Sequence, residues 1–156
     1  MVIGSVMLMI LIKQIFKVDK VPMVLAYGDM VPAVVKIERL KISQDIVPGI
    51  ISGNDWQINE EKVNYLVGSG TLSQENIVLY AHKKWGLFGN LRKIKIGDEI
   101  ELYSVNEISK YEVVEARQVK ASDVSILQGN GEARVTLFTC DGPFDLWRWV
   151  VVGRKS

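Results

Sequence analysis

Cysteine and histidine are scarce in this chain of 156 residues, which has one of each, Cys140 and His82. A single cysteine forms no intrachain disulfide, and one cysteine with one histidine cannot supply the four ligands of a Cys/His zinc site. The HExxH, EF-hand, GxSxG, GxxxxGK[ST] and GxGxxG signatures are also missing. We therefore expect no disulfide framework, no metal site and no cofactor.

An excess of charge of either sign is missing as well. The chain has 19 Lys and Arg against 18 Asp and Glu, a formal net charge of +1, and no basic block. Binding to nucleic acid phosphates requires a concentration of positive charge. We expect no nucleic acid partner.

A hydrophobic run long enough to span a bilayer is not seen either. Residues 1–12 carry no charge, but Lys13 interrupts the run, and a transmembrane helix needs about 20 mainly apolar residues. A secretory signal has a run of this length, but its basic start is missing here. We interpret residues 1–17 as a membrane-anchor or signal-like segment. The alternative is an amphipathic or buried helix packed on the domain.

The remainder divides into a connector and one folded part. Residues 18–33 contain Pro22, Gly28 and Pro32, which interrupt periodic structure and suit a linker. Residues 34–156 are rich in segments with strand patterns, and we predict strands over 33–40, 76–82, 99–104, 111–119, 133–140 and 146–152. A helix over 59–67 and a single turn over 123–127 are the helical predictions. The pattern favours a mostly β fold closed into a barrel, because closure hides strand edges.

The end of the chain carries the most chemical information. Cys140 ends one predicted strand and Arg148 lies in the next, both equally far from Phe144. A hairpin turning near Phe144 places residues 140 and 148 opposite each other on one face of the sheet. A neighbouring guanidinium favours the nucleophilic thiolate and can bind a developing oxyanion. His82, at the end of another predicted strand, is the candidate base, because histidine is the residue type best suited to exchanging protons near neutral pH.

These residues carry a family resemblance. Thr136-Leu137-Phe138-Thr139-Cys140 matches the TLxTC signature of sortases, the cysteine transpeptidases of bacterial cell surfaces. Residues 148–151 resemble the final sortase strand, which begins with arginine, and residues 77–82 resemble the strand that ends in histidine. Residues 56–66 and 87–100 extend the likeness, so it covers about residues 34–156.

The resemblance implies a closed eight-stranded β-barrel with one or two short helices, preceded by the apolar N-terminal segment. It implies that Cys140 attacks a backbone carbonyl in an LPxTG-like sorting signal and forms a thioacyl-enzyme. His82 would protonate the departing amine and deprotonate the incoming one, and Arg148 would hold substrate and oxyanion. The implied location is the bacterial cell membrane, with the catalytic domain on its extracytoplasmic side.

The resemblance also implies partners and a substrate groove. The partners would be surface proteins with a C-terminal sorting signal and an amine acceptor, either a cell-wall precursor or a pilin lysine. The groove is expected beside Cys140 and Arg148, with Thr139 as a further substrate contact. Val124, Ile126 and Leu127, in the loop from 121 to 132, either line this groove or pack into the core.

Two functions other than general surface-protein anchoring stay open. One is a pilin-polymerising sortase that uses a lysine side chain as acceptor. The other is a non-catalytic barrel that binds peptide.

Overall fold

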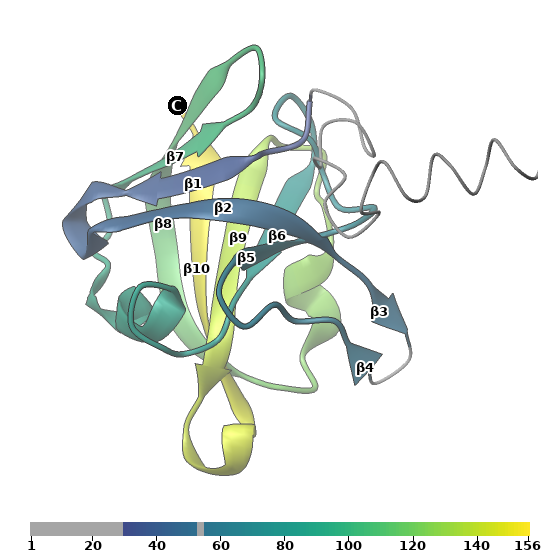
Figure 1. Cartoon of the computed structure of the whole chain (residues 1–156), viewed down its shortest axis with the longest axis vertical. Coiled ribbons are helices and arrows are strands. Elements are labelled where there is room, and N and C mark those ends of the chain that lie inside the picture. Colours follow the sequence, from purple (N-terminus) through teal and green to yellow (C-terminus); the bar gives the residue numbers. More distant parts are fainter. Residues whose placement is uncertain (1–29, 53–54) are drawn as a thin grey trace, which may run out of the picture.

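The computed structural model of the chain describes residues 30–52 and 55–156, and strands dominate its regular structure (Figure 1). The anchor interpretation of residues 1–17, and the linker interpretation as far as residue 29, lie outside the described residues. The last residues of the expected linker pack on the domain, where Val31 is buried and the carbonyl of Met30 accepts a hydrogen bond from the Leu72 amide.

Eight strands close into a barrel in the order β1-β2-β5-β6-β9-β10-β8-β7. The strands are β1 (Val34–Ile37), β2 (Ile42–Gly49), β5 (Val63–Leu66), β6 (Asn76–Tyr80), β7 (Glu99–Tyr103), β8 (Ile108–Lys120), β9 (Arg134–Asp141) and β10 (Trp147–Lys155). Two further short strands, β3 (Ile51–Ser52) and β4 (Asp55–Trp56), pair with each other outside the barrel. The expected mostly β fold with a closed eight-stranded barrel is confirmed.

Helical structure is limited, in the part of the chain that is described, to four 3-10 segments. These are η2 (Glu38–Leu40), η3 (Phe88–Lys93), η4 (Val124–Leu127) and η5 (Pro143–Asp145). The turn predicted over 123–127 is confirmed as η4, where the Asp123 side chain accepts a hydrogen bond from the Ser125 amide.

The helix predicted over 59–67 is wrong, because its second half is strand β5. Val63 pairs in parallel with Ile46 of β2, and Val63, Asn64 and Tyr65 are all buried. The Asn59 side chain accepts hydrogen bonds from the Glu61 and Lys62 amides, but the turn that it caps leads into a strand. Burial on both faces in the sheet outweighed a local helix signal.

Apolar side chains form one cluster inside the barrel and a second cluster on its outer face. The inner cluster includes Ile77, Leu79, Leu137 and Val151. The outer cluster is built on Val78, Tyr80, Val119, Ile126, Phe138 and Val150. Side chains alternate between the two faces along β6, β9 and β10, so these strands are buried on both sides.

Two pairs of neighbouring strands are parallel, and one of them brings distant parts of the sequence together. β6 runs parallel to β9, with Tyr80 paired to Phe138, although 58 residues separate them. β9 then pairs antiparallel with β10. The C-terminal ends of β6 and β9 and the start of β10 therefore meet at one end of the barrel. The β9–β10 connection projects from this end, and the β7–β8 connection projects from the opposite end (Figure 1).

Candidate active site

Cys140 and Arg148 are directly paired across β9 and β10. Directly opposed residues in an antiparallel pair share a face, with Cβ atoms about 5 Å apart. This face is the outer one, because Phe138 and Val150, two residues before Cys140 and two after Arg148, belong to the outer apolar cluster. The predicted hairpin register is confirmed.

His82 follows the β6 strand and approaches the same position. The β6–β9 register pairs Tyr80 with Phe138, and His82 and Cys140 each lie two residues further along. The Thr139 hydroxyl donates to the carbonyl oxygen of Ala81 at 2.8 Å, which fastens the residue before His82 to the residue before Cys140. Three neighbouring strands thus bring His82, Cys140 and Arg148 to one end of the barrel.

His82 also has a carboxylate partner. Its Nε2 atom lies 3.2 Å from Oε1 of Glu60, whose other oxygen lies 3.8 Å from Nζ of Lys84. In the sequence Glu60 is followed by Glu61, and adjacent glutamates are typical of a solvated surface. Its place beside His82 depends on the chain path before β5, which no local pattern predicts.

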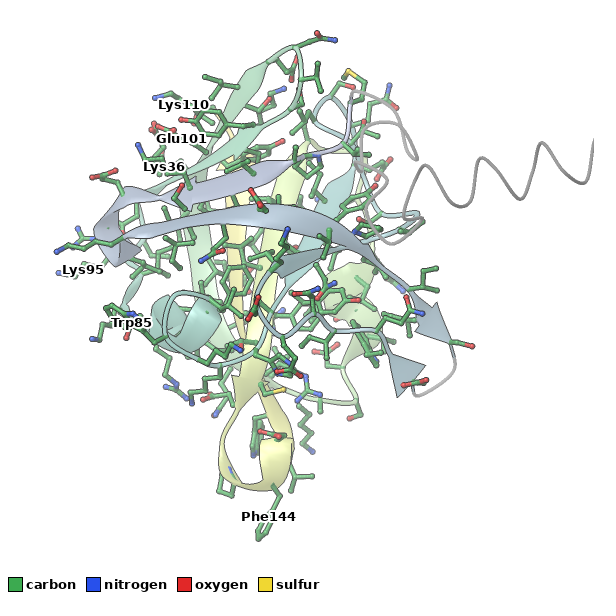
Figure 2. The ribbon with its side chains drawn as sticks, viewed as in Figure 1. Lys36, Trp85, Lys95, Glu101, Lys110 and Phe144 are labelled. Carbon is green, nitrogen blue, oxygen red and sulfur yellow. The ribbon has the colours of Figure 1, made fainter. Side chains whose placement is uncertain are left out.

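Arg148 is held by the β9–β10 connection that precedes it. Its Nη1 atom donates to the carbonyl oxygens of Asp145 at 2.7 Å and Trp147 at 2.9 Å. The connection is tight: Phe144 and Asp145 have left-handed φ values of 54° and 55°. Such a conformation is uncommon for residues other than glycine, and residues that adopt it are often found at functional sites. Phe144 lies at the tip, 93% exposed, and points away from the barrel (Figure 2).

The outer apolar cluster lies next to this site on the same strands. The Tyr80 and Phe138 rings stack with centroids 5.5 Å apart, and Trp56 meets both rings edge-on. The Tyr80 hydroxyl donates to the carbonyl oxygen of Gln57 at 2.6 Å. Burial raises the pKa of Tyr80 to about 12, so this hydroxyl stays a neutral donor at physiological pH.

The four residues predicted to contact substrate occupy different environments. Ile126 is buried in the outer cluster and Leu127 packs against it, whereas Val124 is exposed. Thr139 is 3% exposed and uses its hydroxyl to hold Ala81. Substrate contact by these four residues stays a prediction.

A buried amide that the sequence analysis missed holds the loop carrying η4. The Nδ2 atom of Asn76 donates to the carbonyl oxygens of Ile126 at 3.0 Å and Gln128 at 3.2 Å. Its Oδ1 atom accepts a hydrogen bond from the Thr136 hydroxyl at 2.7 Å. Asn76 and Thr136 are each 1% exposed. The first threonine of the TLxTC signature therefore orients the amide that fixes this loop over the outer face.

A second group missed from the sequence lies behind the site. The carboxylate of Asp141 is 2% exposed and accepts hydrogen bonds from Lys83, Arg92 and Gln118. Hydrogen bonds from Arg92 in the first place hold the pKa of Asp141 well below its usual range. Asp141 directly follows Cys140, and this position alone could have marked it as part of the site. No local pattern predicted that the Arg92 side chain, from η3, would bond its carboxylate.

The described residues contain no group of three His, Cys, Asp or Glu side chains that could hold a metal ion. No helix among them is long and apolar enough to cross a bilayer.

The comparisons with known proteins agree on one family. The profile of the sortase domain matches residues 35–156, which is most of the chain. The protein therefore belongs to the sortase family. It is 38% identical over 68 residues to sortase A of Listeria monocytogenes, a stretch that covers 43% of this chain and 31% of that protein.

Solved structures give the same result. The crystal structure of Listeria monocytogenes sortase A superposes with a TM-score of 0.69 at 25% identity and covers 82% of this chain and 88% of that one. Sortase C of Clostridium perfringens superposes with a TM-score of 0.68 at 25% identity, covering 81% and 70%. The complex of Streptococcus agalactiae sortase C1 with MTSET superposes with a TM-score of 0.69 at 26% identity, covering 79% and 66%.

Replacing Asn76 tests what holds the η4 loop. Asn76→Ala removes three hydrogen bonds, and the carbonyls of Ile126 and Gln128 lose a partner. We expect a loss of about 1–3 kcal/mol in the free energy of unfolding and faster hydrogen exchange at amides 124–128. Asn130→Ala, in the same loop but exposed, is the control and should change neither quantity. Unchanged exchange in Asn76→Ala would show that other contacts hold the loop.

Proposed function

We propose that the protein is a cysteine transpeptidase that cleaves an LPxTG-like sorting signal and transfers the acyl part to a primary amine. The observation that carries this proposal is the pairing of Cys140 with Arg148 at the barrel end that His82 also approaches. Membership of a family whose members are transpeptidases supports the same activity.

The proposed first half-reaction is acyl transfer to sulfur. The Cys140 thiolate attacks the carbonyl carbon of the scissile peptide bond, forming a carbon–sulfur bond and an oxyanion. The carbon–nitrogen bond then breaks, and the departing amine takes its proton from the His82 imidazolium. In the second half-reaction an incoming amine gives a proton to His82, attacks the thioester and releases the thiolate.

The proposed role of Arg148 follows from the geometry of its side chain. A guanidinium offers five N–H donors in a planar fork, and the bonds of Nη1 to Asp145 and Trp147 hold one arm of the fork in place. The group can therefore direct its other donors at a substrate carbonyl or oxyanion without first being ordered.

We place the groove for the sorting signal along the outer face beside Cys140, between the η4 loop and the segment of Trp56. The half-buried apolar side chains there, which include Trp56, Ile58 and Leu127, suit the Leu-Pro part of the signal, and the buried Tyr80 and Phe138 support them from below. Val124 and Ile126 belong to the loop wall of this groove. For Thr139, which the sequence predicted as a substrate contact, we propose instead that its buried hydroxyl acts from behind by fixing the two strands. The matched stretch covers 31% of the Listeria protein. We therefore name the acceptor by its chemical class, a primary amine.

We further propose that residues 1–17 tether the barrel to the bacterial membrane on its extracytoplasmic side. The support is the absence of charge from residues 1–12. Surface proteins with a C-terminal sorting signal would be the partners on that side.

The nucleophile is tested by the mass of the intact protein. Without an amine acceptor, an LPxTG-like peptide should add the mass of its acyl portion to the wild type, because the thioester accumulates. Cys140→Ala should gain no mass and should keep the wild-type circular dichroism spectrum. MTSET, which was crystallised with the Streptococcus agalactiae enzyme, should inactivate the wild type. An adduct on Cys140→Ala would contradict the mechanism.

The general acid and base is tested by pH. If Cys140 and His82 must each be in one protonation state, kcat/KM plotted against pH should be bell-shaped. His82→Ala should lose at least about 10²-fold in kcat/KM and lose the bell shape, since His82 is the one histidine of the chain. Free imidazole, which can enter the vacated space, should restore part of the rate. A variant that keeps most of the rate would remove His82 from the reaction.

The guanidinium is tested by separating charge from shape. Arg148→Lys keeps a positive charge but loses the planar fork, so kcat should fall by about 10² or more, nearly as far as in Arg148→Ala. Arg154→Lys, on the same strand but paired with β9 at Arg134, is the control and should stay near the wild-type rate. Near-normal turnover of Arg148→Lys would limit the role of Arg148 to stabilising the thiolate.

A further inference from the structure

The residues that follow His82, Cys140 and Arg148 in the sequence belong to one network of contacts behind the site. These residues are Lys83, Asp141 and Trp149, and together with Arg92 and Gln118 we call them the Asp141 cluster. Nζ of Lys83 lies 2.9 Å from Oδ1 of Asp141. Because side chains alternate along a strand, the cluster lies on the face opposite to Cys140 and Arg148.

Arg92 joins the two halves of this cluster. Its Nε atom donates to Oδ1 of Asp141 at 3.2 Å, and its Nη2 atom donates to Oδ2 of the same carboxylate. The centre of the guanidinium also lies 4.4 Å from the centroid of the Trp149 ring. One side chain from η3 thus contacts the residue after Cys140 and the residue after Arg148.

The third donor to Asp141 comes from a further strand. Nε2 of Gln118 in β8 donates to Oδ2 of Asp141 at 2.8 Å, and Gln118 is paired with Trp149 across β8 and β10. The buried carboxylate therefore receives donors from β8, from η3 and from the segment after His82. A short backbone shift in any of these elements would break a bond to a 2% exposed charge, which is costly.

We propose that Arg92 is a positioning residue that, through Asp141 and Trp149, sets the relative placement of Cys140, Arg148 and His82. The inference rests on the proposed function for its catalytic consequence but not for its effect on the thiol. Arg92 acts on the backs of the strands and needs no contact with substrate.

The cluster also sets the charge behind the thiol. Lys83 and Arg92 carry two positive charges against the one negative charge of Asp141, so the cluster has a net charge of +1. The other charged or titratable groups on the side of Cys140 are Arg148 opposite it and His82 with Glu60, which also pairs with Lys84. On the side of Asp141, Lys120 at the end of β8 lies opposite Trp147. Removing the charge of Arg92 lowers the net charge of the cluster by one, and removing the charge of Asp141 raises it by one.

The opposite charge changes distinguish a positioning role of Arg92 from a merely structural one. Arg92→Gln leaves the cluster neutral, so the pH midpoint of Cys140 alkylation by iodoacetamide should rise by about half a unit or more. Asp141→Asn leaves a net charge of +2, so the midpoint should fall by a similar amount. The double variant restores +1 and should return the midpoint close to that of the wild type.

The value of kcat should depend on the contacts of Arg92 with Asp141 and not on the net charge of the cluster. We expect kcat for peptide transfer to fall about 10-fold or more in all three variants, including the double variant with its restored midpoint. Arg92→Lys keeps the charge but loses the two-pronged contact, so it should keep the midpoint and lose rate. Lys93→Gln, at the next residue of η3, removes one positive charge without touching Asp141 and is the matched control. It should keep kcat within about twofold and the alkylation midpoint within about 0.2 units of the wild type.

The alkylation measurement needs no sorting peptide, so it reports on the cluster even if the proposed transpeptidation fails. If Asp141→Asn does not fold, the Arg92→Gln and Arg92→Lys pair decides, because the Arg92 side chain is half exposed. Midpoints that stay within about 0.2 units in Arg92→Gln, or a wild-type kcat in Arg92→Lys, would overturn the proposal.

Discussion

The pairing of β9 with β6 on one side and β10 on the other is the constraint on which the site depends. Strand β9 contains Cys140. His82 follows its neighbour β6, and Arg148 lies in its other neighbour, β10. A shift of one residue in either register would turn Cys140 or its partner to the opposite face. Two hydrogen bonds between β9 and the β6 segment resist such a shift: the Thr139 hydroxyl donates to the Ala81 carbonyl, and the Thr136 hydroxyl donates to the Asn76 side chain.

This arrangement gives the TLxTC signature a physical interpretation. Thr136 orients Asn76, which holds the η4 loop, and Thr139 fastens Ala81, which precedes His82. Leu137 lies in the inner core and Phe138 in the outer cluster, so the strand is anchored on both faces. Each residue before Cys140 thus acts on a different neighbour of the site.

Charge is distributed between the two faces of the same strands. Arg148 and His82 lie on the side of the thiol, and the Asp141 carboxylate with Lys83 and Arg92 lies behind it. The carboxylate stays ionised because its partners lower its pKa. Burying this carboxylate costs free energy, and the hydrogen bonds from its donors offset that cost only while the donors stay in place. The stability of this end of the barrel therefore depends on the same contacts that fix the geometry of the site.

Patterns in the sequence predicted most of the strands and the 140–148 register, because alternation and turn spacing are local properties. Strands β2 and β5 were missed: Pro48 and Gly49 interrupt the first, and the capped turn at Asn59 imitates a helix start before the second. Asn76, Glu60 and Arg92 could not be assigned from the sequence. Their contacts join segments separated by 22 to 60 residues, and only the closed barrel brings those segments together.

Transpeptidation by this protein is measured most directly by a transfer assay with two substrates. The purified protein is incubated with a library of LPxTG-like peptides and a primary amine, and the products are analysed by mass spectrometry. We expect a product in which the amine has replaced the leaving part of one peptide class, formed by the wild type and not by Cys140→Ala. Unchanged peptides with the folded wild-type protein, or transfer that persists in Cys140→Ala, would contradict this expectation.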